Sequence, residues 1–468
     1  MLRQWNFEIE LELDNKRVPV YKQLAKQIQQ MIESGILKNG DLLPGGREIA
    51  QKLNISRKTV LSAMELLVFS GWLENRERVG LFVHNPQHNA PQTAQQAAVV
   101  LPQPHAPVTV APVPSLVIND GYPDTKILSF KELSSAFRQL FNQAARWHML
   151  GYSDPLGNVK LRTALSQGIC HERGLQTCIE QLMLTRGSQQ ALYLVAHVLL
   201  HPGDAVVVED PGYLNARRAF ESSGLRVLPV PVDEEGLQTD KLKDLLATES
   251  CIRALYVTPR YQYPTTVTLS SVRRRQLVEL VNAHNLLVVE DDFGCNFQFT
   301  EHHLKPLSVL LSPEHYIYIG TFSKILAPAL RLGFVVTTPE FIKQMGDYRQ
   351  LVDMQGDNVM ERAILDLIEK GELKRHIRRA SKVYRERLQY ATTLIRKELG
   401  NNVIFKKPDG GLALWMEFED DPTERLAQCG ISATIEKLAN QRFGLRVGYA
   451  SMQTEEIDRL IMALKSDK

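Results

Sequence analysis

Lys324 stands a few residues past the apolar run Tyr316–Ile319, and the stretch between them carries the hydroxyls of Thr321 and Ser323. A lysine amine placed just past a strand end can form a Schiff base with an aldehyde cofactor. The two hydroxyls and the nearby guanidinium of Arg331 are groups that bind a phosphate. Most lysines after strands are merely solvated, so this stretch is weak evidence until the rest of the chain is considered.

Two other segments follow apolar runs and carry groups suited to a flat, phosphorylated ligand. Thr185–Gln190 opens a helix directly after a strand, so its main-chain amides and Ser188 can surround a phosphate, with Gln189 next in the chain. Tyr213 ends the segment Glu209-Asp-Pro-Gly-Tyr213 and offers a ring that can stack on a heterocycle. Each has an ordinary alternative: a plain helix cap for Ser188, and simple packing for Tyr213.

Three consecutive acids, Glu290, Asp291 and Asp292, end another apolar run. Burying a carboxylate is costly unless it meets a cation or a metal, so at least one of them should face a positive group. A divalent metal and a protonated pyridine nitrogen are the two candidates. The sequence has no histidine pair or further acidic cluster at metal-ligand spacing beside them, which favours the pyridine and predicts no metal site.

Together these groups match what pyridoxal 5'-phosphate requires: a Schiff-base lysine, an acid for the ring nitrogen, a stacking ring and a phosphate cradle. Arg446, within Gly444-Leu-Arg-Val-Gly448, is a further candidate, because a guanidinium can hold a substrate carboxylate through two hydrogen bonds. The alternative for Arg446 is a surface salt bridge.

Such groups can meet only if several strands bring them to one edge of a sheet, and the second part of the chain has that pattern. From residue 115 onward, apolar strands alternate with helices, which is typical of an α/β domain on a mainly parallel sheet. Ligands of such sheets bind beyond the carboxyl ends of the strands. The clearest strands are Gln181–Thr185, Ala205–Glu209, Arg253–Val257, Leu286–Glu290 and Phe334–Thr337. About 350 residues are enough for a large subdomain and a smaller one at the carboxyl-terminal end.

The first 84 residues have a different pattern. Apolar spacing predicts helices at residues 20–34, 46–53 and 57–68, followed by two short strands within 71–83. A helix, a short turn, a second helix and a β-wing make a winged helix-turn-helix.

The start of the third predicted helix has the chemistry for DNA. Ser56 is a good N-cap for it. Arg57, Lys58 and Thr59 lie in its first turn, where the helix dipole and free amides add to the cationic side chains. Recognition helices contact bases through their N-terminal residues, and Arg47 on the preceding helix can bind a phosphate. The alternative is a small helical bundle with ordinary surface charges, since cations and anions are nearly balanced here.

Residues 85–114 join the two parts, and their Pro-, Gln- and Ala-rich composition predicts a semi-rigid linker. The whole chain has a formal net charge of +2, so any DNA-binding surface must be local. The five cysteines form no CxxC pair, and the sequence has neither the apolar core of a signal peptide nor a run of membrane-spanning length. We therefore expect a cytoplasmic protein of two or three domains with no membrane partner.

The motifs, taken in order, resemble those of a known regulator family. Leu43-Pro-Gly-Gly-Arg-Glu-Ile-Ala-Gln-Lys-Leu-Asn-Ile-Ser-Arg-Lys-Thr-Val60 is similar to the GntR-type winged helix. Gly151-Tyr-Ser-Asp-Pro-Leu-Gly157, Glu290-Asp-Asp292 and the stretch Gly320–Gly333 are similar to the MocR subfamily of GntR regulators. The resemblance implies a winged helix-turn-helix at 1–84, a linker at 85–114 and, at 115–468, a fold-type-I aminotransferase-like domain for cofactor binding and dimerisation.

The resemblance also implies roles for residues of the second part. Lys324 would form the Schiff base with pyridoxal phosphate, and Asp291 would pair with the pyridine nitrogen. Arg331 and Ser323 would serve the phosphate, and Tyr213 would stack on the ring.

Partners follow from the same resemblance. Arg47, Arg57 and Thr59 fall where the family contacts DNA, and Gly80 lies in the wing. A homodimer would place two winged helices on paired half-sites of a double-stranded operator. A small amino-compound effector, with its carboxylate on Arg446, or the cofactor itself would shift the equilibrium between two domain arrangements.

The chain departs from the family pattern around the expected pocket. Phe293 stands where the family usually has tyrosine, so a hydrogen bond to the ring hydroxyl is missing. Tyr261 and Thr266 replace a histidine and a glycine in the loop Thr258–Thr266. A lost neutral hydrogen bond costs about 0.5–1.5 kcal/mol, so cofactor binding should survive with altered affinity or effector choice.

We predict a pyridoxal-phosphate-dependent, DNA-binding transcriptional regulator with at most a weak transaminase half-reaction. Two alternatives stay open. One is a working aminotransferase whose winged helix is incidental, and the other is a cofactor-free dimeric DNA-binding regulator.

Overall fold

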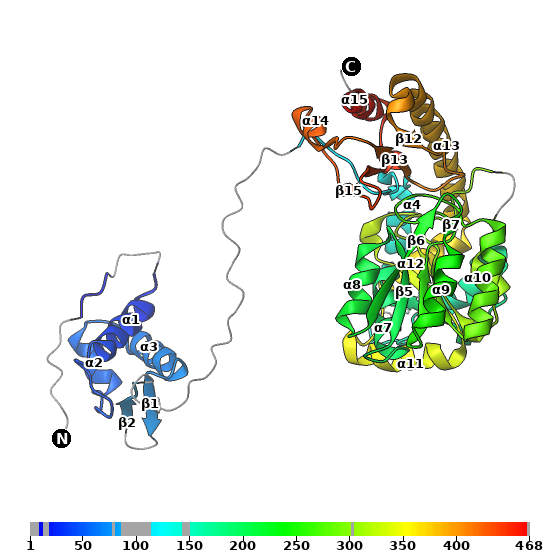
Figure 1. Ribbon diagram of the computed structural model, residues 1–468. Helices are drawn as coiled ribbons and strands as arrows, with labels where there is room; N and C mark the ends of the chain where they lie inside the picture. The colour runs from blue at the N-terminus through cyan, green and yellow to red at the C-terminus, as the bar shows by residue number, and fades with distance from the viewer. Residues whose placement is uncertain are drawn as a thin grey trace. The chain divides into compact units, whose positions relative to one another are not determined.

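The computed structural model describes residues 9–12, 18–76, 80–85, 114–142, 150–300 and 304–465. The chain divides into two compact units, Met1–Thr109 and Val110–Lys468 (Figure 1). Most of the segment predicted as a linker, residues 86–113, lies outside the described residues.

The first unit is a three-helix bundle with a β-wing. Its elements are α1 (Val20–Glu33), α2 (Gly46–Lys52), α3 (Arg57–Phe69), β1 (Leu73–Arg76) and β2 (Gly80–Val83). Leu24, Ile28 and Ile32 recur at every fourth position of α1 and are all buried in the bundle, which is why this stretch is helical. β1 and β2 pair antiparallel, and the Leu43 amide donates to the Leu81 carbonyl at 2.9 Å on the other side of β2. The predicted winged helix-turn-helix is confirmed.

The second unit is built on an eight-stranded sheet of order β4-β11-β10-β9-β8-β5-β6-β7. The strands β10, β9, β8, β5 and β6 are parallel to one another, whereas β11 is antiparallel to both its neighbours and β7 is antiparallel to β6. The bounds are β4 (Leu182–Thr185), β5 (Ala205–Asp210), β6 (Arg226–Asp233), β7 (Gly236–Leu237), β8 (Ile252–Val257), β9 (Leu287–Asp291), β10 (Tyr316–Thr321) and β11 (Gly333–Val336).

Helices cover both faces of this sheet. In β5, Val206 and Val208 belong to one apolar cluster, and Ala205 and Val207 to another. Because alternate residues of a strand point to opposite faces, both faces are buried, as expected for a mainly parallel sheet. One cluster includes side chains of α7 (Ser188–Val198), α8 (Leu214–Ser222) and α11 (Pro339–Val352). The other includes side chains of α6 (Val159–Ala164), α9 (Thr239–Thr248), α10 (Ser271–His284) and α12 (Asn358–Glu369).

A smaller subdomain follows in the chain and has its own core. Its sheet has the order β12-β13-β16-β15 and packs with α13 (Glu372–Glu398) and α15 (Thr454–Leu464). The strands are β12 (Ile404–Phe405), β13 (Leu414–Phe418), β15 (Ile435–Lys437) and β16 (Phe443–Val447), and α14 (Thr423–Gln428) precedes β14 (Ile431–Ser432). The smaller subdomain predicted at the carboxyl-terminal end is therefore present.

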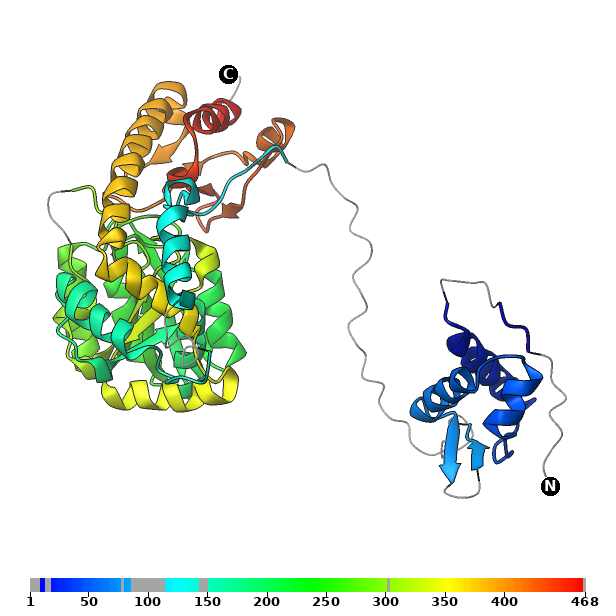
Figure 2. The same cartoon turned by 180° about the vertical axis from the view of Figure 1, so that it is seen from behind.

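The start of the second unit also belongs to this subdomain, which the sequence did not indicate. β3 (Leu116–Val117) pairs in parallel with β14, and Ile118 joins the subdomain's core. From there the chain runs along the unit into α4 (Phe130–Asn142), the cyan segment of Figure 2. Within the described part of the chain, no helix combines the length and the apolar character that a membrane crossing demands.

Candidate cofactor pocket and DNA surface

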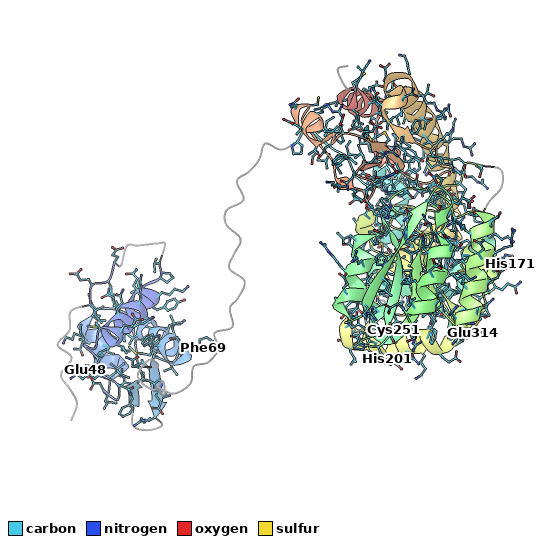
Figure 3. The ribbon with its side chains drawn as sticks, viewed as in Figure 1. Glu48, Phe69, His171, His201, Cys251 and Glu314 are labelled. Atoms are coloured by element: carbon cyan, nitrogen blue, oxygen red, sulfur yellow. The ribbon has the colours of Figure 1, made fainter. Side chains whose placement is uncertain are left out.

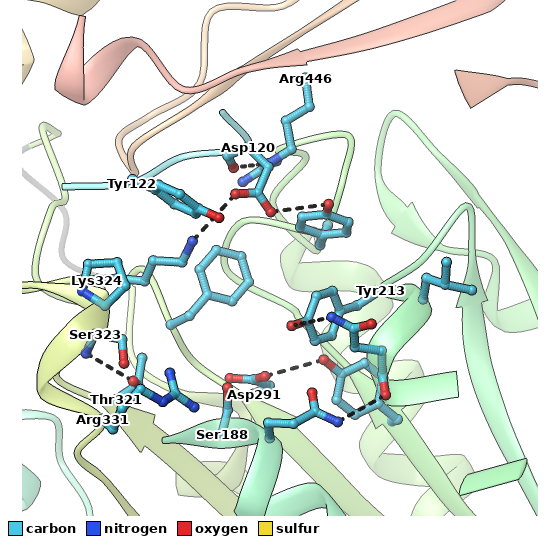
Figure 4. Close-up of a pocket in the computed structure, with 17 residues that line it drawn as sticks. Asp120, Tyr122, Ser188, Tyr213, Asp291, Thr321, Ser323, Lys324, Arg331 and Arg446 are labelled. Carbon is cyan, nitrogen blue, oxygen red and sulfur yellow. Dashed lines mark hydrogen bonds and ion pairs between the residues drawn. The ribbon is translucent and has the colours of Figure 1, made fainter. Parts of the chain in front are cut away.

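A cavity of about 420 Å³ opens beyond the carboxyl ends of β5, β9 and β10, with the start of α7 and part of the smaller subdomain in its wall (Figure 4). Every residue predicted for the cofactor or the effector carboxylate lines it: Lys324, Asp291, Arg331, Ser323, Thr321, Tyr213, Ser188, Gln189 and Arg446. Side chains that sequence reasoning did not assign to the site also line it: Asp120, Tyr122, Asn215, Tyr256 and Tyr263. Segments far apart in the sequence thus share one cavity, as sheets of this kind arrange their ligand sites.

Asp291 ends β9 and is almost fully buried in the floor of the cavity. The Tyr256 hydroxyl donates a hydrogen bond to its Oδ2 at 3.3 Å, whereas its Oδ1 has no hydrogen-bond partner among the described residues. Burial raises the pKa of this carboxyl to about 7. A buried carboxylate with one unsatisfied oxygen is a site for a cationic N–H group.

The two neighbouring acids have other partners. Alternate strand residues point to opposite faces, so Glu290 and Asp292 leave the side that Asp291 takes. Glu290 accepts hydrogen bonds from the amides of Leu307 and Ser308 at 2.8 and 2.7 Å. Asp292 is paired with Arg260, whose Nε lies 3.0 Å from its Oδ1. At least one of the three acids was expected to face a positive group. For Asp292 that group is Arg260.

Lys324 reaches into the cavity from the turn after β10. Its Nζ donates a hydrogen bond to the Gly121 carbonyl at 2.9 Å and lies 3.9 Å from Asp120 Oδ1. Burial lowers the pKa of the Lys324 ammonium. A lowered pKa increases the fraction of free amine, which is the nucleophilic form.

One end of the cavity has the features of a phosphate cradle. Gly187 precedes α7 with a φ of 80°, and a Cβ there would lie 3.1 Å from the Arg331 guanidinium, so the arginine lies against this bare glycine backbone. Arg331 donates to the Arg186 carbonyl at 2.8 Å. The Ser323 hydroxyl is buried and has no hydrogen-bond partner among the described residues, while its amide donates to Thr321 Oγ1 at 3.1 Å. The unpaired hydroxyl and the helix start are what a phosphate would satisfy.

Tyr213 and Arg446 lie on the other side of the cavity. The Tyr213 ring meets the Tyr263 ring edge-on at 5.2 Å between centroids, and the Arg446 guanidinium lies 4.8 Å from the Tyr263 centroid. Arg446 is 9% exposed and donates to the carbonyls of Asp120 and Pro264 at 2.8 and 2.6 Å. Arg446 is therefore buried and bonded to main-chain carbonyls, and within the described part of the chain it is not part of a surface salt bridge.

The three departures from the family pattern fall in different places. Phe293 lines the cavity. Tyr261 instead packs beside Gly294 and Gly411 and donates to the Phe297 carbonyl at 3.2 Å, outside the set of lining residues. Thr266 has a φ of 62°, a conformation that costs a residue with a Cβ about 1–2 kcal/mol and costs glycine nothing.

The residues predicted for DNA are exposed on the first unit. Arg47, Arg57 and Lys58 are exposed, and Ser56 caps α3 by accepting a hydrogen bond from the Thr59 amide at 3.1 Å. The Arg57 and Lys58 side chains start from the first turn of α3, where the helix dipole favours an anion. Arg47 lies in the first turn of α2 beside Glu48, which Figure 3 labels at the surface of this unit.

Gly80 opens β2 with a φ of 135°, and a Cβ there would lie 3.0 Å from Leu42 Cδ1. The glycine therefore lets the wing pack closely against the segment before α2.

Comparison with known proteins identifies the family. Residues 117–464 match the family described as aminotransferase class I and II, and residues 20–83 match the bacterial regulatory proteins of the gntR family. Since the first match spans most of the chain, the protein belongs to the aminotransferase class I and II family, with a gntR-family domain before it.

Relatives that match most of the chain narrow the class of protein. The chain is 28% identical over 479 residues to the probable rhizopine catabolism regulatory protein MocR of Rhizobium meliloti, covering 96% of this chain and 94% of that protein. It is 29% identical over 392 residues to the pyridoxine biosynthesis transcriptional regulator PdxR of Corynebacterium glutamicum, covering 83% and 81%. The predicted resemblance to the MocR subfamily is confirmed.

Solved structures match the second unit. The α-aminoadipate aminotransferase LysN of Thermus thermophilus, complexed with N-(5'-phosphopyridoxyl)-L-leucine, is 30% identical with a TM-score of 0.67, covering 75% of this chain and 92% of that one. The kynurenine aminotransferase of Pyrococcus horikoshii is 28% identical with a TM-score of 0.69, covering 75% and 90%. The fold-type-I aminotransferase architecture predicted for residues 115–468 is confirmed.

Proposed function

We propose that this protein is a transcriptional regulator that binds operator DNA through its winged helix and senses an amino compound, or pyridoxal 5'-phosphate itself, through its aminotransferase-like unit. The observation that supports this most strongly is the similarity to the regulatory protein MocR over 96% of this chain, together with the match of residues 20–83 to the gntR family. An aminotransferase with an incidental winged helix would not account for relatives of that kind.

The pocket supports pyridoxal phosphate as the cofactor, because the unpaired oxygens of Asp291 and Ser323 match a pyridinium N–H and a phosphate. The cofactor would supply an aldehyde that condenses with a primary amine with loss of water, and a ring that withdraws electrons. Lys324 would offer the amine that holds the cofactor, and Asp291 would accept a hydrogen bond from the ring nitrogen. Tyr213 would stack on the cofactor ring, and Arg446 would bind the carboxylate of an effector through its guanidinium.

The remaining predicted contacts belong to the phosphate and to DNA. Ser188, Gln189, Thr321 and Arg331 would surround the phosphate together with Ser323. The DNA contacts would come from the exposed first turn of α3, from α2 and from the wing: Arg47, Ser56, Arg57, Lys58, Thr59 and Gly80. We further propose a homodimer, which would bring two such surfaces to a double-stranded operator.

The cofactor assignment is tested by adding pyridoxal phosphate to the purified full chain, reducing with borohydride and locating the added mass. We expect the adduct on Lys324 in the wild type and none in Lys324→Ala. The matched control is Lys343→Ala, an exposed lysine that pairs with Asp347 at 3.3 Å and should leave the adduct unchanged. A colourless protein with no adduct would favour the cofactor-free alternative.

The regulator assignment is tested by binding to the DNA upstream of the protein's own gene. We expect sequence-preferring affinity that falls steeply with salt, since Lys and Arg contacts to phosphates release counterions. Equal, weak affinity for any sequence would contradict it.

The similarity to LysN keeps an active aminotransferase as a second candidate. It is tested by incubating the loaded protein with amino and keto acids. Sustained product formation would support the aminotransferase.

A further inference from the structure

The ammonium group of Lys324 is surrounded by three groups from one short segment, Asp120–Tyr122 (Figure 4). The Gly121 carbonyl accepts its hydrogen bond at 2.9 Å, Asp120 Oδ1 lies 3.9 Å away, and the Tyr122 ring centroid lies 5.0 Å away. A carbonyl, a carboxylate and an aromatic ring are the groups that bind a primary ammonium, through hydrogen bonds, charge and the ring quadrupole.

The Asp120 carboxylate is held in place by contacts that leave one oxygen unused. The Tyr263 hydroxyl donates to Oδ2 at 3.3 Å, and the Arg446 Nε donates to the Asp120 main-chain carbonyl at 2.8 Å. Oδ1 is buried and has no hydrogen-bond partner among the described residues, although it lines the cavity beside Lys324. Leaving a buried carboxylate oxygen unsatisfied is costly, so this atom is suited to a donor that comes from outside the chain.

When its nitrogen is bonded to the cofactor, Lys324 no longer offers a free ammonium to this segment. The carbonyl, carboxylate and ring would remain, and the space that the ammonium occupied would lie next to the atom at which an incoming amine must react. Resting on the proposed function, we propose that Asp120–Tyr122 is an ammonium subsite that docks the primary amine of the effector in its protonated form; the amine reacts only after it has released that proton to water.

The neighbouring cation defines the rest of the ligand class. Arg446 contacts the main chain of the same Asp120 whose side chain would hold the ammonium. Asp120 and Arg446 line the same cavity, so one ligand with an ammonium and a carboxylate could reach both groups. The subsite selects compact amino acids with a free primary amine over amines or carboxylates alone.

The test uses the full chain loaded with pyridoxal phosphate and three probes: L-alanine, propylamine, which lacks the carboxylate, and propionate, which lacks the amine. Binding of alanine and propylamine is followed by the visible absorbance of the cofactor, and propionate is measured as a competitor of alanine. Asp120→Asn keeps the size of the side chain and removes its charge. Asp120→Glu keeps the charge. Glu436→Gln is the matched control, because Glu436 acts electrostatically on Arg446 but does not line the cavity.

We expect Asp120→Asn to weaken the binding of propylamine and of alanine by about tenfold to a hundredfold, which is the range for losing a hydrogen bond to a charged group. The inhibition constant of propionate should not change in Asp120→Asn, and Asp120→Glu should recover part of the amine affinity. Glu436→Gln should bind propylamine, which has no carboxylate for Arg446, as the wild type does. Equal loss for propionate and propylamine, or unchanged amine affinity in Asp120→Asn, would overturn the subsite. The borohydride adduct at Lys324 and the unfolding midpoint show whether each variant is folded and loaded.

This result is separable from the proposed function. Selective loss of amine affinity in a protein that does not bind DNA preferentially would support the subsite and contradict the regulator. Unchanged amine affinity in a protein that binds its operator would contradict the subsite alone. A wild type that takes up no cofactor would overturn the subsite whatever the DNA result.

Discussion

The two units place charged groups in opposite ways. In the first unit, Arg47, Arg57 and Lys58 are exposed, and their side chains start from the first turns of two helices. In the second unit, Arg446 and Asp291 are buried and come from strands in different sheets. The first arrangement depends on long-range charge and is weakened by salt, whereas the second depends on short contacts that water does not screen.

The difference bears on how each site responds to substitution. An exposed cation stabilises its own unit little, so replacing it should change binding and leave folding intact. A buried charge belongs to the folded core as well as to the site, so replacement changes stability unless the group is held for a ligand. Asp291 and Asp292 are adjacent, and both are buried. Asp292 represents a buried charge that is paired within the core, and Asp291 represents one that is held for a ligand.

Replacing Asp292 should produce the largest loss of stability. Asp292→Asn leaves Arg260 buried beside a neutral amide and weakens the hydrogen bond from the Tyr318 hydroxyl, now 2.7 Å long. Removing one partner of a buried ion pair costs about 3–5 kcal/mol, which denaturant titration of the second unit measures. Asp347→Asn, at an exposed pair, should cost less than about 1 kcal/mol. Equal stability of the two variants would mean that Asp292 is not the paired acid.

Replacing Asp291 should change the pH dependence of stability. Burial raises the pKa of Asp291 from 3.8 to about 7, so between these values the folded protein keeps a proton that the unfolded chain has released. The resulting stability is present below pH 4 and is lost as the pH rises to 7, by at most about 1.4 kcal/mol per pH unit. Asp291→Asn has no carboxyl at this position to titrate, so it should not lose stability for this reason.

The cofactor-free wild type should therefore lose stability from pH 5 to 7 more steeply than Asp291→Asn. Urea titrations of both proteins at three pH values measure the two slopes. Glu209, whose pKa burial also raises to about 7, is common to both proteins and cancels in the comparison. Parallel curves would contradict a protonated Asp291 in the empty pocket.

On the exposed side, Arg57→Ala should weaken operator binding by about 1–3 kcal/mol and lower the slope of log affinity against log salt by about one if the arginine contacts a phosphate. Thermal unfolding of the first unit should not change. Arg217→Ala removes an exposed arginine of α8 that pairs with Glu221 at 2.9 Å, and it should leave affinity and slope as they are. Equal effects of the two variants would place the DNA contact elsewhere.

Ser56→Ala should have the smallest effect. It removes the cap that accepts from the Thr59 amide and should destabilise the first unit by about 1 kcal/mol. Circular dichroism of that unit during denaturation measures the change. Ser56→Asp keeps a capping acceptor and should retain the stability. A loss of the same size in both variants would show that capping is not what Ser56 contributes.

Much of the fold can be predicted from sequence patterns within single helices and strands. Each helix of the first unit carries its own signal: Leu24, Ile28 and Ile32 recur at every fourth position of α1, and Ser56 is the N-cap of α3. The winged helix could therefore be predicted from the sequence. The parallel strands were readable because both faces are buried, which makes them continuously apolar. The join of β3 to β14 was not readable, since it pairs two very short strands from opposite ends of the second unit.

The site divides in the same way. Lys324 and Asp291 follow apolar strands, and that placement indicated them directly. Asp120 and Tyr122 follow no strand of the large sheet, and only the tie of their segment to the smaller subdomain brings them to the cavity. Arg260 lies in the altered loop Thr258–Thr266, and its pairing with Asp292 could not be predicted because it depends on a tertiary contact.

We propose that cofactor binding in the pocket of the second unit controls DNA binding by the first unit. It is tested by the affinity of the full chain for its upstream DNA, measured at one salt concentration with and without pyridoxal phosphate, in the wild type and in Lys324→Ala. We expect the cofactor to change the affinity of the wild type and to leave that of Lys324→Ala unchanged. The same change in both proteins, or none in either, would contradict control of DNA binding by the pocket.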